Sequence, residues 1–494
     1  MSAISASKDA PAEKAGAHAP PAHATRWAAL GLLGWALLSA AAAAIGAVAM
    51  EPADGRAIGL LVFAIWGMAV RPASAPMEYT SLAYLALLTI TGAMTWEQAW
   101  GGMSKEGIWL IFCGMAMSLA LQETSICARI GRWLCASDPS WPCLLLRLNL
   151  VGACLALVVP SQVVRCQLVL PIARSVLARL PLEGGRCSTA VVAALVISTN
   201  HCGAAVLTGG LPNIVATGAL QQCGINITWG FWFVRMAPVY WVFSILGNTG
   251  VLLLFTRRSV GRPSESSASS RAPESPDGAE EESEEALSGR EWAVLAIFAL
   301  SLGMWSTDFL HGVRPATTAL VAVLVLFCPS LGPIPFDHLK RVNFPVIIYA
   351  ASLGTLAPLV TGAPGLGAGA ARAARAALEL APGELGRLGM LFLVSQPLVM
   401  VNVMLPVALL VPQLCGGDSG LAGLGIEPRL GAMLVSAAPG CVVLAYQNAP
   451  FLIALSLSRD IVRERHFAVL IMGNAVFQLL VALPAVLAWW ALLG

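Results

Sequence analysis

Residues 159–171 read V-P-S-Q-V-V-R-C-Q-L-V-L-P and interrupt a strongly apolar stretch with proline, serine, two glutamines and an arginine. A helix that only crosses a bilayer has no use for these residues at its centre, because each buried polar or ionisable group costs roughly 2.5–3.5 kcal/mol on insertion scales. A weaker break of the same kind follows at Ser395-Gln396-Pro397. Two broken apolar segments in corresponding halves are the best sequence pointer to the binding site of a transporter.

The composition of the chain is that of an integral membrane protein. Of its 494 residues, 57% are hydrophobic and only 11% are charged. Soluble domains are about 25% charged. Apolar windows near the ~20 residues that a bilayer requires recur along the chain. The net charge of +2 gives no reason to expect a nucleic-acid partner. We therefore expect an all-α protein whose surroundings are the lipid bilayer.

Eleven apolar segments indicate transmembrane helices, and two more contain the polar breaks. The eleven spans are expected near residues 27–50, 57–70, 80–94, 107–122, 187–212, 229–256, 291–309, 315–331, 343–361, 430–456 and 467–492. The segments 142–183 and 388–414 are expected to form re-entrant helical hairpins, because polar backbone at membrane depth is tolerated only inside protein or around a water-filled cavity.

The polar segments divide the chain and set its orientation. We predict five parts: a disordered cytoplasmic tail (1–26), a first transmembrane helix (27–56), a first inverted repeat (57–256), a disordered cytoplasmic linker (257–290) and a second inverted repeat (291–494). Loop arginines and lysines favour a cytoplasmic N-terminus and an outside C-terminus. The Ala-, Gly- and Arg-rich composition is typical of a GC-rich bacterial genome, so we expect a multi-pass protein of the cell (inner) membrane.

Four segments of the first half recur in the second in the same order, which indicates an internal repeat. The offsets run from 234 to 238 positions, for Ile111-Phe112 and Ile348-Tyr349, Ser161-Gln162 and Ser395-Gln396, Leu170-Pro171 and Leu405-Pro406, and Pro212 and Pro450. Each predicted copy holds five crossings and one hairpin. An odd number of crossings inserts the second copy upside down, as in many secondary transporters.

The first break carries groups that suit an anion. Ser161 and Gln162 offer neutral hydrogen-bonding groups, and Arg165 offers a fixed charge with a planar fork suited to a carboxylate or sulfate. The alternative is that Arg165 snorkels to the inner surface or pairs with a buried acid, but the candidate acids Glu123 and Asp308 lie at span ends. Contact with substrate is the preferred interpretation for an intramembrane charge.

A second polar stretch follows in the next span, where residues 198–213 read S-T-N-H-C-G-A-A-V-L-T-G-G-L-P-N. Small polar residues at mid-span and the Gly-Gly-Leu-Pro-Asn ending indicate an unwound helix. A glycine-rich packing surface is the alternative. His201 alone does not indicate a metal, and the twelve cysteines form no C-x-x-C pair. We expect the cysteines to be small buried hydrophobes, and we expect no metal site and no cofactor.

These two stretches resemble the divalent anion:sodium symporters, the family of dicarboxylate, citrate-type and sulfate transporters. The first hairpin tip of that family reads S-N-T-A-T-A-A-M-M-L-P, and residues 161–171 match its length with Ser and Leu-Pro in register. The span that follows reads S-A-N-I-G-G-I-G-T-L-V-G-T-P-P-N, and residues 198–213 fit it without a gap. The resemblance covers the chain from about residue 57 and marks it as a divergent member.

The resemblance implies two sites, one in each half, and a homodimer. We expect the substrate to be bound by Ser161, Gln162, Val163, Arg165, Asn200, Ser395, Gln396 and Asn448. We expect Na⁺ as a coupling ion at Ser161, Gln162, Gly203 and Gln396. No catalytic residue is expected.

The first tip departs from the family pattern in a way that bears on the ion. Gln162 replaces Asn, Val163 replaces Thr, and Arg165 replaces a small residue. Sodium requires a cage of oxygens, so the lost hydroxyl argues against sodium coupling. Arg165 can supply charge that bound cations otherwise provide.

The function that these features predict is secondary active transport of a small dianion, a di- or tricarboxylate or a sulfate-like ion, by alternating access. A proton-coupled antiporter or oxyanion efflux pump of the same fold group is the alternative, but it needs a titratable acid at mid-membrane. An intramembrane enzyme would need paired aspartates, a Ser/His couple or H-E-x-x-H, and the sequence has none of these. A structural or sensory role would leave two symmetric polar breaks unexplained.

Overall fold

The computed structural model describes residues 34–46, 51–70, 77–135, 139–159, 162–178, 185–257, 259, 286–401, 403–415, 421–443 and 448–493. Every regular element within these ranges is a helix, as the all-α prediction requires. Most of the predicted tail and linker lies outside the described residues, and so does Ser161.

The elements of the first half follow the predicted spans closely. They are a helix at Gly34–Gly46, then α2 (Pro52–Val70), α3 (Met77–Ile90), α4 (Trp96–Trp100), η2 (Gly101–Ser104), α5 (Glu106–Gln122), α6 (Ile126–Cys135), α7 (Trp141–Val158), α8 (Gln162–Leu177), α9 (Arg186–Ala204), η3 (Leu207–Gly209), α10 (Leu211–Gln222) and α11 (Trp229–Thr256).

The second half is more finely divided. Its elements are α12 (Gly289–Ser306), α13 (Asp308–His311), α14 (Pro315–Leu326), η4 (Phe336–Arg341), α15 (Phe344–Leu353), α16 (Leu356–Thr361), α17 (Pro364–Glu379), α18 (Gly383–Val401), α19 (Leu405–Leu410), η5 (Pro412–Cys415), η7 (Ala422–Leu424), α20 (Pro428–Ala437), η8 (Ala438–Cys441), α21 (Ala449–Leu457), α22 (Glu464–Phe477), η10 (Gln478–Ala482) and α23 (Leu483–Leu493).

Three described helices are long and apolar enough to cross a bilayer unbroken: Arg186–Ala204, Trp229–Thr256 and Glu464–Leu493. A fourth span is formed if Trp96–Ser104 and Glu106–Gln122, which meet at 45°, are counted as one. Several shorter apolar helices of the described part have 10–17 residues. The eleven-span topology and the inverted repeat therefore stay predictions.

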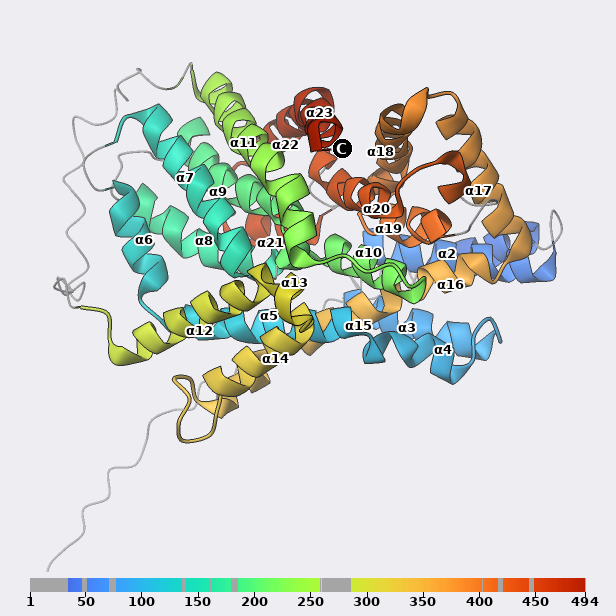
Figure 1. Ribbon diagram of the computed structural model, residues 1–494, viewed down its shortest axis with the longest axis horizontal. Helices are drawn as coiled ribbons and strands as arrows, with labels where there is room; N and C mark the ends of the chain where they lie inside the picture. Colours follow the sequence, from blue (N-terminus) through green and yellow to red (C-terminus); the bar gives the residue numbers. More distant parts are fainter. Residues whose placement is uncertain are drawn as a thin grey trace, which may run out of the picture.

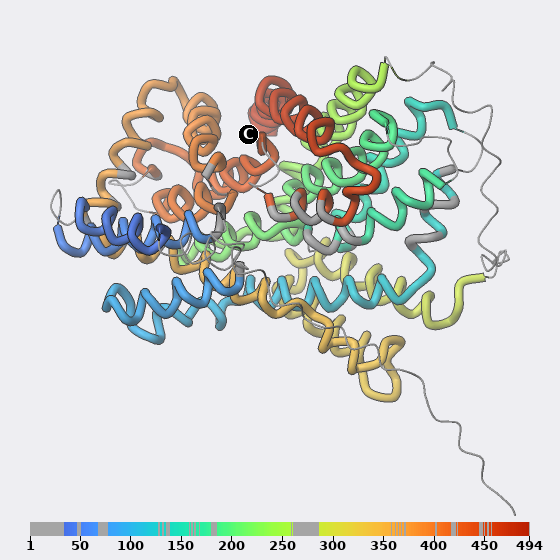
Figure 2. Tube along the Cα trace, turned by 180° about the vertical axis from the view of Figure 1, so that it is seen from behind, coloured from blue at the N-terminus to red at the C-terminus, as the bar shows by residue number. Residues whose placement is uncertain are grey.

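The helices gather into two groups over a common layer. Figure 1 shows α7, α8, α9 and α11 on one side and α17 to α20 on the other, with α5, α12, α14 and α15 running beneath. The C-terminal helices α22 and α23 lie between the two groups, and Figure 2 shows the same arrangement from behind. Helix α9 is the centre of the first group, because every residue from Cys187 to Ala204 is buried.

Both predicted unwound spans are broken in the structure. The first is α9 and α10, separated by residues 205–210, and the second is α20 and α21, separated by residues 442–448 after η8. Pro212 and Pro450 are each the second residue of the helix that follows the break, where a missing N–H costs nothing. The prediction placed the first break too early, since residues 198–203 remain helical.

The helix break in the first predicted hairpin segment lies where the sequence places it, and the break in the second segment, 388–414, lies later than Ser395-Gln396. Helix α7 ends at Val158 and α8 begins at Gln162. In the second segment α18 continues through Pro397 to Val401, and α19 begins at Leu405. The second break is therefore several residues later than Ser395-Gln396, because Pro397 is tolerated inside the helix.

The cysteines are not uniformly small buried hydrophobes, which corrects that expectation. Cys223, just after α10, and Cys415, at the end of η5, form a disulfide with Cα atoms 6.1 Å apart and 192 positions apart in sequence. Cys154 is exposed on α7. The disulfide joins the first half of the chain to the second.

Candidate functional site

One charged side chain from α8, that of Arg165, contacts the first broken helix. Arg165 lies in the first turns of α8 and its side chain has 0% exposure. Its Nη1 donates to the carbonyl of Val159 and its Nη2 to the carbonyl of Gly209, both at 2.5 Å. The guanidinium thus bridges the end of α7 and the short 3-10 helix η3, which lies between α9 and α10.

Arg165 follows neither of the two alternatives weighed against substrate contact. A fully buried side chain does not snorkel to the surface. Among the described residues, no carboxylate lies within ion-pair distance of its guanidinium. Its Nε is buried and has no hydrogen-bond partner there either. The charge is held by carbonyl dipoles alone, which is costly unless a further partner arrives.

Glycines make room for this arrangement. A Cβ on Gly203 would lie 2.3 Å from Nη2 of Arg165 and 2.7 Å from the carbonyl oxygen of Gly209. A Cβ on Gly209 would lie 2.5 Å from the carbonyl oxygen of Gly203. Gln162 lies against Gly210, where a Cβ would come within 3.2 Å of Nε2. The hairpin tip therefore approaches the start of α10 too closely for side chains at these positions.

The carbonyls that end α9 are satisfied by side-chain donors. Nδ2 of Asn213 lies 3.0 Å from the carbonyl of Gly203, 3.3 Å from that of Ala204 and 2.8 Å from that of Val206. The carbonyl of Ala204 also accepts from Nε1 of Trp232 at 3.0 Å. A helix end leaves such carbonyls without partners inside the helix, and here the protein itself supplies the partners.

Two predicted site residues from opposite halves meet directly. Nδ2 of Asn448, at the start of α21, donates to Oδ1 of Asn200 on α9 at 3.0 Å, and each side chain is 3% exposed. Oγ of Ser436 lies 3.4 Å from the carbonyl of Pro212. Oγ1 of Thr199, beside Asn200, is buried without a partner among the described residues. The two broken helices therefore share one buried polar contact zone.

Sequence reasoning missed a second set of buried amides beside this zone. Nδ2 of Asn248 donates to Oδ1 of Asn149 at 2.5 Å, and Nδ2 of Asn474 donates to Oδ1 of Asn248 at 3.0 Å. One turn farther along the last long helix, Nε2 of Gln478 lies 3.1 Å from Nδ1 of His201 and 3.1 Å from Oγ of Ser244. The signal was present as lone polar residues in four apolar spans.

The predicted second site is less developed. Oγ of Ser395 donates to the carbonyl of Leu391 at 2.8 Å, and Nε2 of Gln396 donates to that of Phe392 at 3.0 Å. Both side chains thus bond to their own helix, α18. Of the remaining predicted residues, Val163 lies on α8 with its side chain outside the described part, and residues 444–447 are outside it too.

The two buried aspartates of the described part serve as helix caps. Asp54 accepts from the backbone N–H groups of Gly365 and Leu366 at the start of α17. Asp308 accepts from the N–H of Trp229 at the start of α11 at 2.6 Å. A carboxylate is favourable at a helix N-terminus. Neither acid is placed at the breaks, where a proton carrier would be needed.

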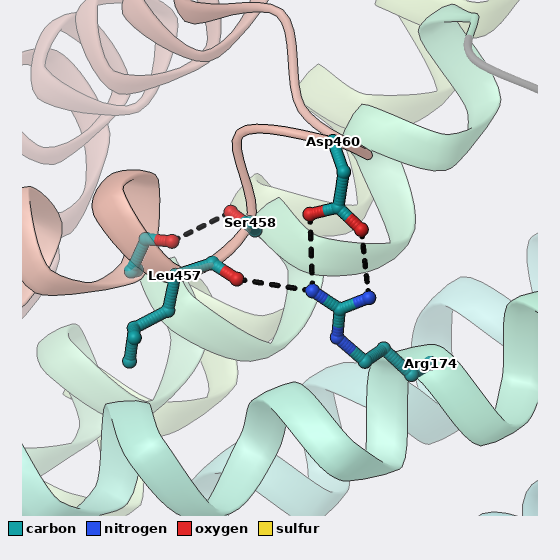
Figure 3. A network of polar contacts seen from close by, with 5 residues as sticks. Arg174, Leu457, Ser458 and Asp460 are labelled. Carbon is teal, nitrogen blue, oxygen red and sulfur yellow. Dashed lines mark hydrogen bonds and ion pairs between the residues drawn. The ribbon is translucent and has the colours of Figure 1, made fainter. Parts of the chain in front are cut away.

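An ion pair closes the group at the far end of α8. Arg174 donates from Nη1 and Nη2 to the two oxygens of Asp460, at 2.7 and 3.0 Å, and Nη2 also donates to the carbonyl of Leu457 (Figure 3). Ser458 bonds back to α21 through the carbonyl of Ala454 at 2.6 Å. The bond to Arg174 holds the pKa of Asp460 below its usual value. The pair ties the first hairpin to the loop after the second broken helix.

In the described part of the chain, no three histidine, cysteine, aspartate or glutamate side chains are grouped to hold a metal ion. The polar groups at the breaks are amides, hydroxyls, carbonyls and one guanidinium. This donor set suits an anion or a monovalent cation rather than a transition metal.

Comparison with known proteins bears on both the sequence and the fold. A family model described as the sodium:sulfate symporter transmembrane region matches residues 33–367. Among solved structures, the crystal structure of the Alcanivorax borkumensis YdaH transporter, described as revealing an unusual topology, is similar with a TM-score of 0.52 and 16% identity. That match covers 83% of this chain and 89% of the other, and bears on the fold alone. No curated protein matches the chain.

Proposed function

Because the chain belongs to the sodium:sulfate symporter family and is therefore a membrane transporter of anions rather than an enzyme, we propose that it moves a small dianion by alternating access. The observation that carries this proposal is Arg165. Its guanidinium is buried beside a broken helix and has no carboxylate partner among the described residues, which leaves positive charge where a dianion is bound favourably.

The proposed substrate lies between the first hairpin and the two broken helices. Gln162 and the N–H groups at the start of α10 supply donors on one side, since a helix N-terminus favours anions. Asn200 and Asn448 supply amides where the halves meet. Ser161, Val163, Ser395 and Gln396 complete the set that the family resemblance implies. Nε of Arg165 and Oγ1 of Thr199 are two buried polar atoms that have no partner among the described residues and that a ligand could satisfy.

Uptake of labelled succinate into proteoliposomes tests this function, with competition by citrate, sulfate and tartrate to identify the anion. We expect Arg165→Ala to lower uptake at least 100-fold while the protein remains in the membrane, since the charge that attracts the dianion is gone. The matched control is Arg174→Ala, which removes an exposed arginine from the other end of α8. Normal transport by Arg165→Ala would end the assignment.

The proposed setting is the inner membrane, with the N-terminus in the cytoplasm. This orientation puts the segment after the span 187–212 and the end of the second hairpin on the outside. Cys223 and Cys415 lie in these two places and form a disulfide, which is a bond that persists in oxidising compartments. A membrane-impermeant reductant applied to intact cells should therefore free both thiols for labelling. If the disulfide is reduced only after the cells are lysed, the result would indicate the opposite orientation.

We propose that the bundle containing the hairpins moves during transport, while the rest of the protein forms a fixed scaffold. In the expected homodimer, the scaffolds of the two subunits would contact each other. The ion pair of Arg174 and Asp460 supports one moving unit, because it links the first hairpin to the second broken helix. Cross-linking in native membranes followed by mass measurement tests the dimer. Detection of only the monomer under those conditions would contradict the proposed dimer.

A further inference from the structure

We propose that the guanidinium of Arg165 is a tethered cation, standing between the first hairpin and the first broken helix in the place where a mobile Na⁺ would otherwise bind. Transport would then need no sodium at this half of the site. This inference rests on the proposed function and adds the coupling of that same site.

Arg165 makes the kind of contact that a bound cation makes, because both of its hydrogen bonds in the described part go to backbone carbonyl oxygens. Its two terminal nitrogens donate to the carbonyls of Val159, which caps the end of α7, and of Gly209, the last residue of η3 in the break between α9 and α10. Unwound backbone carbonyls of this kind coordinate the coupling ion in transporters with broken helices. The guanidinium is covalently attached to the chain and donates to both carbonyls. No Na⁺ from solution is therefore needed to bind them.

Four other carbonyls at the end of α9 and in the break also accept hydrogen bonds from side chains. Asn213 donates to those of Gly203, Ala204 and Val206, and Nε1 of Trp241 donates to that of Cys202 at 2.9 Å. A sodium ion at this place would have to displace protein donors and sit beside a positive charge. Both requirements oppose its binding.

The sequence departures agree with the same inference. Val163 has no oxygen to offer where the family has threonine. The space that the guanidinium fills depends on Gly203, whose added Cβ would lie 2.3 Å from Nη2. Removing the arginine would free two carbonyls around a buried gap, which is the arrangement that a small cation can enter.

Thermal unfolding of the purified full-length protein in sodium chloride against choline chloride tests the inference without any substrate. In wild-type protein the sodium-specific shift in Tm is expected to be small. In Arg165→Ala it should grow by about 3 °C or more, because Na⁺ now binds the freed carbonyls. Arg165→Lys, which keeps a tethered cation, and Arg174→Ala, which alters an exposed site, should behave as wild type. Equal shifts in wild type and Arg165→Ala would overturn the inference.

Two further measurements test the inference if Arg165→Ala folds poorly. Arg165→Gln keeps an amide donor without the charge and should show the same gain in sodium dependence; if it does not, the inference fails. Wild-type uptake should be independent of sodium or show a Hill coefficient near one, and a coefficient above about 1.5 would require a second ion and overturn the inference. Absence of any dianion uptake by wild type would end the proposed function alone, because the unfolding comparison needs no substrate.

Discussion

Each half of the molecule contains a broken helix and a predicted hairpin segment, but the polar side chains in these places are bonded in different ways. In the first half Arg165 and Asn213 reach across to the carbonyls of the unwound segment. In the second half the hydrogen bonds described for Ser395 and Gln396 go to carbonyls of their own helix, α18. A break in a membrane helix needs partners for its backbone, and the first half supplies them from its own side chains. We therefore expect the first half to be pre-organised and the second to respond to the ligand.

The largest expected effect comes from Gly203→Ala, which adds a Cβ 2.3 Å from Nη2 of Arg165 and 2.7 Å from the carbonyl of Gly209. The arginine side chain must then move away from the carbonyls of Val159 and Gly209, so we expect at least a 100-fold loss of uptake and a lower Tm. Gly218→Ala on α10 is the control, because nothing lies within 4 Å of a Cβ there. Similar behaviour of the two variants would show that the first half is not tightly built around Arg165.

The next prediction compares the two glutamines directly. Gln162→Ala removes an amide that lies against Gly210 at the start of α10, and we expect the apparent affinity for substrate to fall about tenfold. Gln396→Ala removes an amide already bonded to its own helix, and we expect a smaller loss. Concentration dependence of initial uptake rates measures both. A larger loss in Gln396→Ala would reverse the contrast between the halves.

A double-mutant cycle on Asn200 and Asn448 measures how strongly the halves are joined. Their side-chain hydrogen bond is buried, so each single alanine variant should lose about 1–2 kcal/mol of stability. The double variant should lose clearly less than the sum, because the two changes remove one bond. Additive losses, measured by denaturant or thermal unfolding, would mean that the contact is not an energetic link.

The smallest effect is expected from the exposed pair of Arg174 and Asp460. Asp460→Asn should leave uptake within about twofold of wild type, since exposed ion pairs contribute little. The pKa of Asp460 is lowered in the folded protein. The contribution of the pair is therefore present at neutral pH and is lost as pH falls below the ordinary aspartate value of about 3.9.

The measurement for this pair is the difference in Tm between wild type and Asp460→Asn across pH. Asp337→Asn is the matched control, because Asp337 pairs with Lys340 three residues away and joins no distant elements. A Tm difference for Asp460→Asn that increases in acid would contradict the sign of the pKa shift.

The breaks of the first half could be predicted from the sequence because they use residues that punctuate helices. Polar residues after Val159 mark the first hairpin turn, and Pro212 marks the restart at α10. The second turn was misplaced because Pro397 is accommodated inside α18. The amphipathic helix α17 was missed, since it is too polar to be read as a span.

The partners within the site could not be predicted in the same way. Arg165 is held by the backbone carbonyls of Val159 and Gly209. Every residue has a backbone carbonyl, so the sequence does not indicate which carbonyls will bind the arginine. Asn200 and Asn448 were each chosen as site residues, but their contact joins positions far apart in the chain. The apposition of Cys223 and Cys415 depends on the same long-range packing, which spacing rules do not see.

That disulfide gives the molecule a covalent topology different from its linear order. It closes the chain between Cys223 and Cys415 into a ring that includes α11, the segment 257–290 and everything through α19. A single proteolytic cut anywhere in the ring would leave one covalent molecule. The two halves would part only after a cut and a reduction together, so the pairing of the broken helices survives damage to the segment that connects them.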